Sequence, residues 1–286
     1  MATFKDIKKR INAVKSTRKT TSAMKMVASS KLRKAEQAIS QLSPYSNELH
    51  LILHSLLTND YENSLCKERP IRNVAIIAFS SDSSLCGAYN SNISHTTQKV
   101  VEKYRQSLGI DHIFVYTVGK KVYEYFKKAG ISVTKNFENI AGNPNYPVMA
   151  DFAMSLISQF ENNQIDRVEM IYHHFKSVGS QKLVNNQLLP VILPKQEKQV
   201  GRYLDYIFEP SLMDLLKKLI PKSIKLQLYT ALLDANVSEH AARMIAMQTA
   251  TDNADDLVSE LTIQYNKSRQ QAITNELLDL IGGSAK

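Results

Sequence analysis

A run of 60 residues near the C-terminus, positions 222–281, contains neither glycine nor proline. Apolar or small residues recur in this run at steps of three, four and seven, which places most of them on one stripe of an α-helix. They are Ile224, Leu228, Ala231, Ala235, Ala242, Ile245, Thr249, Leu257, Leu261, Tyr265, Ala272, Leu278 and Ile281. At about 1.5 Å per residue the helix would be roughly 90 Å long. A helix of that length with one narrow apolar stripe requires a partner helix along its length.

The N-terminal segment, residues 3–57, supplies that partner. Its apolar positions follow the same helical steps and include Ile11, Ala28 and Leu32. Pro44 predicts a kink in this helix, because proline removes one backbone hydrogen bond of the helix interior. The two ends of the chain are therefore predicted to form a long antiparallel coiled coil, with everything between them inserted at one end.

The middle of the chain has short apolar runs that alternate with helical patterns. Strands are predicted at 73–79, 111–118, 131–133, 167–175, 183–193 and 204–208, and helices at 92–107, 119–129 and 147–162. This alternation is typical of an α/β sheet covered by helices and at least partly parallel. The predicted fold class is α/β, with a Rossmann-like domain inserted into a coiled coil. Its segments are residues 1–58, 73–208 and 210–286, and Pro210 and Pro221 mark the return to helix.

The positive charge of the chain is concentrated at one end. The formal net charge is +9, and residues 1–44 hold 11 Lys or Arg against 2 acidic residues, so the rest of the chain is balanced. Charge localised in this way indicates an acidic partner surface. A solvated helix face and a transit peptide are the two plainer interpretations. A coiled coil that binds nucleic acid is the functional alternative, although Phe4 is the only aromatic residue of this segment.

Few residues point to catalysis. No phosphate-binding glycine loop occurs, and residues 80–87, which follow the first predicted strand, are better explained as a turn than as a ligand site. Cys86 has no recognisable base for a nucleophile. His173 and His174 point to opposite faces of a strand, and His240 is interpreted as structural. The sequence thus predicts no catalytic residue, no cofactor and no metal.

Two features of the whole sequence bear on the redox compartment and the membrane topology of the protein. Cys66 and Cys86 are too few for a disulfide framework and suit a reducing compartment. No apolar run approaches the roughly 18 residues that a membrane-spanning helix needs. We therefore expect a chain that does not cross a membrane, although it can dock on a complex that does.

Both ends of the chain resemble one known family, the gamma subunit of the rotary, proton-translocating (F-type) ATP synthase. The resemblance is carried by residues 4–35, by residues 238–254 and by residues 265–276, and it extends over essentially the whole chain. Two departures occur. Ser83-Ser84 stands where the family has Arg-Gly in the loop after the first strand, and Ser284 stands where alanine is usual.

The resemblance implies a non-catalytic rotor shaft of an ATP synthase, which takes part in ATP synthesis and proton transport. In that family the coiled coil turns inside a ring of alternating alpha and beta subunits, and the α/β domain lies near the epsilon subunit and the membrane ring of c subunits. Contacts with the alpha/beta ring are expected at Lys9, Arg10, Lys19, Met24, Lys25, Lys31, Arg243, Gln248 and Thr251. The expected place is the cytoplasmic face of a bacterial inner membrane, with the matrix side of the mitochondrial inner membrane as the alternative.

Overall fold

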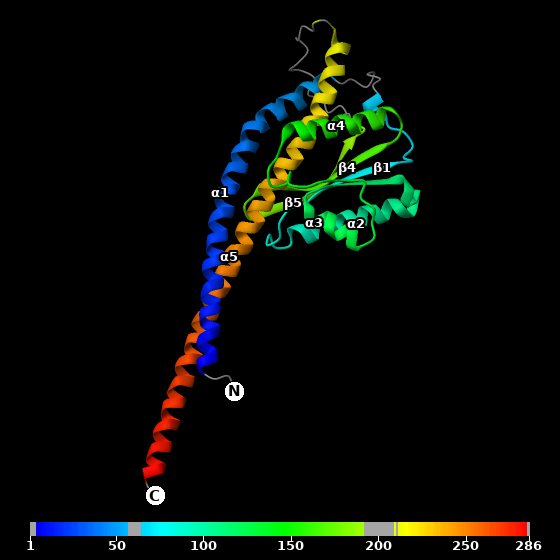
Figure 1. The fold of residues 1–286 in the computed structure, drawn as a ribbon. Coiled ribbons are helices and arrows are strands. Elements are labelled where there is room, and N and C mark those ends of the chain that lie inside the picture. Colours follow the sequence, from blue (N-terminus) through cyan, green and yellow to red (C-terminus); the bar gives the residue numbers. More distant parts are fainter. Residues whose placement is uncertain (1–3, 57–63, 192–208, 210, 285–286) are drawn as a thin grey trace. The chain divides into compact units, whose positions relative to one another are not determined.

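The computed structural model describes residues 4–56, 64–191, 209 and 211–284 (Figure 1). In chain order the elements are α1 (Phe4–Leu56), η1 (Ser64–Cys66), β1 (Val74–Phe79), α2 (Tyr89–Leu108), η2 (Ile110–His112), β2 (Ile113–Val118), α3 (Lys120–Lys128), β3 (Lys135–Phe137), α4 (Tyr146–Glu161), β4 (Arg167–Ser177), β5 (Ser180–Leu189) and α5 (Leu212–Ser284). The chain divides into two compact units, Met1–Ser30 with Arg243–Lys286, and Lys31–Ala242. The three segments expected from the sequence stay a prediction.

The larger unit, Lys31–Ala242, contains a five-stranded sheet in the order β3-β2-β1-β4-β5. β1 pairs in parallel with both β2 and β4, and β2 pairs in parallel with β3. β5 is antiparallel to β4. The sheet is therefore parallel-dominated, as in a Rossmann-like domain, and the α/β fold class predicted from the sequence is confirmed.

Alternate residues of β1 face two separate hydrophobic clusters. Val74, Ile76 and Ala78 belong to a cluster with side chains of α2 and α3. Ala75, Ile77 and Phe79 belong to a larger cluster that includes α4 and residues of α1 and α5. Because both faces of β1 are covered, all six of its residues are buried, which explains why it is a continuous apolar run in the sequence.

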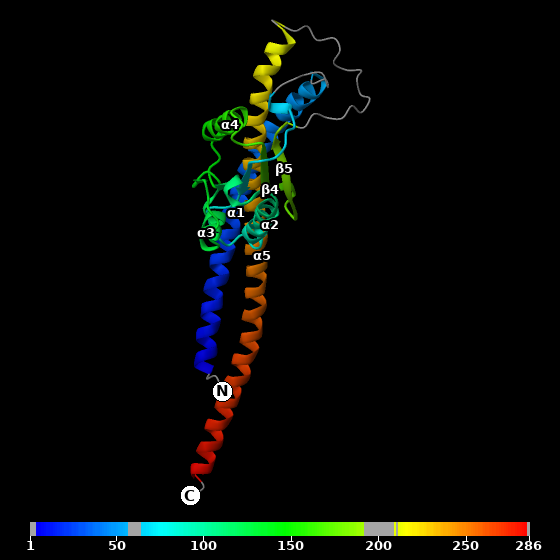
Figure 2. The same ribbon diagram turned by 90° about the vertical axis from the view of Figure 1, so that its right-hand side faces the viewer.

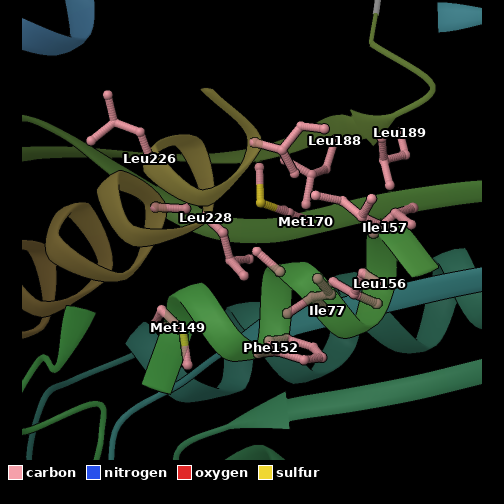
Figure 3. Packing of buried hydrophobic residues seen from close by; sticks show 14 of the residues in the cluster. Ile77, Met149, Phe152, Leu156, Ile157, Met170, Leu188, Leu189, Leu226 and Leu228 are labelled. Atoms are coloured by element: carbon pink, nitrogen blue, oxygen red, sulfur yellow. The ribbon is translucent and has the colours of Figure 1, made fainter. Parts of the chain in front are cut away.

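The larger cluster joins the sheet to the long helices. Figure 3 shows α4 contributing Met149, Phe152, Leu156 and Ile157, α5 contributing Leu226 and Leu228, and the strands contributing Ile77, Met170, Leu188 and Leu189. α4 begins where the sequence predicts, because the Asn145 side chain accepts a hydrogen bond from the Val148 backbone N–H and Pro147 occupies the first turn. The hydrophobic core of this unit therefore includes part of the coiled coil.

The prolines of the long helices do not end them. α1 continues through Pro44, and its C-terminal part bends away from the preceding part in Figure 1. α5 begins at Leu212 and continues through Pro221, one of the two prolines that mark the return to helix in the sequence analysis. The buried side chains of Leu216, Ile220 and Ile224 flank Pro221, so packing of this stretch against the core outweighs the missing hydrogen bond.

Two strand predictions were wrong in position. The short edge strand is Lys135–Phe137 rather than 131–133, where Ile131 and Val133 instead pack as partly buried side chains against the smaller cluster. β5 begins at Ser180, three residues earlier than predicted, and ends at Leu189 before Pro190. The strand predicted at 204–208 lies outside the described residues.

Candidate partner-binding surface

In the smaller unit, the N-terminal part of α1 pairs with the C-terminal part of α5. The side chains buried between them include three small ones, Thr21, Ala28 and Ala254, and three larger apolar ones, Ile11, Met247 and Leu261. Small residues allow two helices to approach closely without wide apolar stripes. This pairing agrees with the antiparallel coiled coil expected from the sequence.

Three contacts fix the direction of the pair. The Thr251 hydroxyl lies 2.8 Å from the Thr21 hydroxyl and also donates to the Met247 carbonyl oxygen at 2.7 Å. Arg18 Nη1 lies 2.6 Å from Asp255 Oδ1. The rings of Phe4 and Tyr265 meet edge to face, with centroids 6.4 Å apart. As the α1 residue number falls, the α5 residue number rises, so the two helices are antiparallel.

The expected contact residues on α1 are mostly at the surface. Lys9, Arg10 and Lys19 are exposed, Lys25 is partly buried, and the Met24 side chain is 39% exposed. Lys31 is also exposed and belongs to the larger unit. We call Lys9, Arg10, Lys19, Lys25 and Lys31 the basic set of α1.

The expected contact residues on α5 are less accessible. Arg243, Gln248 and Thr251 are all partly buried, and Gln248 Nε2 donates to Asp252 Oδ1 at 2.6 Å. Thr251 points toward α1, as its bond to Thr21 shows. A shallow groove of about 300 Å³ brings two of the expected residues together, because Lys19 and Thr251 both line it, with Arg18, Ser22 and Asp255.

Two exposed apolar residues of α1 were missed by the sequence analysis. Met26 is 65% exposed and Val27 is 57% exposed, next to Met24 on the same helix. The sequence could have indicated their exposure, because both lie off the helical stripe that includes Ala28. On α5, Ile263 is 71% exposed. The surface of this pair therefore combines basic side chains with isolated large apolar ones.

The end of α5 extends beyond α1 within the smaller unit. Phe4, the first described residue of α1, lies against Tyr265, whereas α5 continues to Ser284. Figures 1 and 2 both show the last part of α5 projecting past the start of α1. Ile273, Leu277 and Leu278 on this single helix are 46%, 53% and 60% exposed. Large exposed apolar side chains on an unpaired helix indicate a protein-binding surface.

The loop after β1 is a structural turn, as expected from the sequence. Asp82 Oδ1 accepts hydrogen bonds from the backbone N–H groups of Lys120 and Asn139, each at 3.2 Å, and Asp82 Oδ2 accepts one from Gly142 at 3.1 Å. Gly119 has a φ of +96°, and a Cβ there would lie 2.4 Å from the Ser80 carbonyl oxygen. The carboxylate is thus used to join three backbone segments.

Cys86 is buried, with its sulfur 3.1 Å from Asn90 Nδ2. Within the described ranges, no cluster of three or more His, Cys, Asp or Glu side chains has the arrangement of a metal site. No helix among the described residues is both long and apolar enough to span a bilayer.

Comparisons with known proteins agree on one family. The family model described as ATP synthase matches residues 3–285. The chain is 51% identical over 289 residues to the ATP synthase gamma chain of Bacteroides fragilis, with 99% of each chain covered. It is 48% identical over 297 residues to that of Bacteroides thetaiotaomicron, again with 99% of each covered. The rotor of the Euglena gracilis mitochondrial ATP synthase has the same fold, with a TM-score of 0.65 over 94% of this chain and 98% of that one at 17% identity.

Proposed function

Because this chain belongs to the family of ATP synthase gamma chains, we propose that it is the central rotor shaft of the complex. In this role it couples proton flow through the membrane ring to ATP synthesis and hydrolysis in the alpha/beta ring. A gamma chain is a non-catalytic subunit of the ATP synthase. The observation that carries the proposal is the antiparallel pair of α1 and α5, which leaves basic and apolar side chains on its surface and extends into an unpaired helix end.

The shaft role requires contacts that form and release as the shaft turns. The basic set of α1 suits this requirement, because an exposed ion pair contributes only about 0.2–1 kcal/mol. We propose that these side chains meet an acidic loop of the beta subunit, with Met24, Arg243, Gln248 and Thr251 completing the contact. Met24 is flexible and apolar, so it can pass changing neighbours without a fixed hydrogen bond.

The other parts of the chain have distinct proposed partners. The unpaired end of α5, with Ile273, Leu277 and Leu278 exposed, suits an apolar bearing inside the alpha/beta ring. The α/β domain is proposed to face the epsilon subunit and the c-subunit ring. The chain would then be a peripheral protein on the cytoplasmic face of a bacterial inner membrane.

The direct test is to assemble alpha and beta subunits of the same organism with and without this chain. A bead attached to the α/β domain is then observed during ATP hydrolysis. We expect the chain to co-purify with the ring and the bead to rotate in one direction. Failure of the wild-type chain to enter the ring, or hydrolysis without rotation of the bead, would show that the proposal is wrong.

The alternative of a nucleic-acid-binding coiled coil is tested with the same preparation. A basic helix that binds phosphates should retain duplex DNA at low salt and lose it steeply as salt rises. The family match across residues 3–285 favours the shaft instead. Tight DNA binding that competes with assembly into the ring would favour the alternative.

A further inference from the structure

Ten consecutive residues of α5, positions 231–240, are buried, and each residue is at most 6% exposed. A helix at the surface of a domain normally buries one stripe and leaves the other face in water. This stretch also contains five polar or charged residues, which are Asp234, Asn236, Ser238, Glu239 and His240. Polar groups are rarely buried without a reason, because burial removes their bonds to water.

Three of these polar side chains bind to other elements of the larger unit. Asp234 Oδ2 lies 2.8 Å from His174 Nδ1 on β4. The Asn236 amide donates to the Ala141 carbonyl oxygen at 2.6 Å, in the segment between β3 and α4. The Ser238 hydroxyl donates to the His173 carbonyl oxygen on β4 at 2.9 Å.

A fourth contact reaches the helix backbone itself. The Tyr89 hydroxyl, at the start of α2, donates to the Ala235 carbonyl oxygen at 2.9 Å. The Tyr89 ring also stacks on the His173 ring, with centroids 4.5 Å apart. The same short stretch of α5 is therefore bonded to β4, to α2 and to the segment between β3 and α4.

The spacing of the three side chains distributes these bonds around the helix. A helix turns about 100° per residue, so Asp234 and Ser238 share one face, which meets β4. Asn236 lies about 200° from Asp234 and meets Ala141 instead. Bonds on opposed sides of a helix resist both rotation about its axis and sliding along it.

Apolar packing alone does not impose this restriction. The hydrophobic effect is non-directional and depends on the apolar area removed from water, so it separates neighbouring positions of a helix less sharply than hydrogen bonds do. Buried hydrogen bonds have defined distances and directions, and leaving one unmade is costly. Fixing a register is the best-supported use of buried polar groups.

We propose that Asp234, Asn236 and Ser238 form a torsional lock between α5 and the α/β domain. The lock fixes the rotational position of the shaft helix against the domain, so that torque applied to the domain is delivered to the helix without slippage. These residues position the shaft and touch no substrate. The inference rests on the proposed shaft function and assigns the transmission of torque to particular side chains.

The test measures torsional stiffness in the assembled complex. The alpha/beta ring is held on a surface, a probe is attached to the α/β domain, and the width of its angular distribution is recorded without nucleotide turnover. Asn236→Ala and Ser238→Ala, singly and together, should widen the distribution. In membranes they should lower the number of protons pumped per ATP hydrolysed.

Two control variants separate a lock from simple stability. Leu228→Ala removes a fully buried apolar side chain from the same helix, and Val122→Ala removes one from α3 in the other cluster. Both should lower the melting temperature of the chain, because each leaves a cavity in the core, and neither removes a directional contact of α5. We compare control and lock variants that lose the same amount of melting temperature. At that matched loss, we expect the controls to keep the wild-type angular width.

Two results would overturn the lock. One is a wild-type angular width in the double variant Asn236→Ala/Ser238→Ala. The other is equal widening in Leu228→Ala at a matched melting temperature. If the wild-type complex itself does not rotate, the proposed shaft function is wrong. The wild-type measurement alone therefore distinguishes this outcome from failure of the lock.

Discussion

At the scale of single residues, folding lowers the pKa of the His173 side chain. It is 4% exposed, it stacks on Tyr89, and its Nδ1 has no hydrogen-bond partner among the described residues. Burial lowers the pKa of His173 to about 4 from its ordinary value of 6.5, because the imidazolium would lose its solvation. There is therefore a pH range in which His173 is neutral in the folded chain and protonated in the unfolded chain.

The sign of the pH effect follows from that difference. Above pH 6.5 both states are neutral at His173, and between pH 6.5 and about 4 only the unfolded state gains a proton, so the free energy of unfolding falls as pH falls. The full effect is about 3 kcal/mol. Replacing His173 with Phe, which keeps a stacked ring, should remove this part of the acid sensitivity. Urea unfolding at pH 7 and pH 4.5 checks it.

The control for His173→Phe is His112→Gln, which replaces a histidine that is exposed in the folded chain. Asp234 acts in the opposite direction, because burial raises its pKa and its neutral form gains favour as pH falls. Asp234 is present in both proteins, so the difference in pH dependence between His173→Phe and wild type reports on His173 alone. An unchanged slope in His173→Phe would mean that another group controls the acid response.

A second prediction at the residue scale concerns two ion pairs of different burial. Arg69 Nε lies 2.7 Å from Asp166 Oδ1, and Arg69 also donates to the carbonyl oxygens of Phe160 and Ile165 at 2.6 Å. Asp166 is 7% exposed. Removing one partner of a buried pair costs about 3–5 kcal/mol. Asp166 Oδ2 keeps its bonds from the Arg72 and Asn73 backbone N–H groups, and the Arg69 side chain is 22% exposed, so Arg69→Met should cost an amount near the lower end of that range.

The matched comparison is Arg18→Met. Arg18 pairs with Asp255 at 2.6 Å, but the two side chains are 44% and 50% exposed. An exposed pair contributes only about 0.2–1 kcal/mol. Denaturant unfolding of both variants gives the comparison, and equal losses would show that burial does not decide the strength of these pairs.

At the scale of elements, the sequence predicted what depends on local pattern. Long stretches without glycine and with helical spacing predicted both shaft helices. The continuous apolar run predicted β1, which is buried on both faces. The position of β3 was missed, because tertiary packing decides it. The burial of residues 231–240 could not be read from the sequence either. Its polar residues resemble a solvent-exposed stretch until the surrounding strands are in place.

The same limit applies to the candidate surface. The basic residues of α1 were found by counting charge, and the exposed positions of Lys9, Arg10 and Lys19 agree with a surface role. Met26 and Val27 were missed because a stripe analysis searches for what is buried. The Thr251 side chain points inward because it contacts Thr21 on the other helix. The spacing of residues within α5 alone does not predict this contact.

The unpaired end of α5 gives a prediction about an element. Cutting the chain after Gln271 removes Ile273, Leu277 and Leu278, which lie past Phe4, the first described residue of α1. A single helix there has few neighbours within the chain, so we expect the truncation to lower ATP synthesis less than replacing the whole basic set of α1 with Gln. Proton-driven synthesis by the two reconstituted complexes checks it. An equal or larger loss from the truncation would contradict the expectation.

At the scale of the whole molecule, a rotating shaft must avoid any contact that is too strong to release. The excess positive charge of the chain lies in residues 1–44, and the rest is balanced. Weak, screened pairs distributed over several side chains meet this need. No single member of the basic set should therefore be essential to coupling.

Met24 is the position where this balance is most easily disturbed. Its side chain is 39% exposed, flexible and apolar, and Lys25 follows it on the same helix. Met24→Lys would add a cation able to hold an acidic group on a surface that otherwise releases its contacts. We expect this variant to impair the coupling of rotation to synthesis more than Lys25→Ala or Lys31→Ala does. The measurement is the ratio of proton-driven ATP synthesis to ATP hydrolysis in each assembled complex. If Met24→Lys keeps the wild-type ratio while a single Lys→Ala variant abolishes it, coupling depends on individual charges and the releasing-surface explanation is wrong.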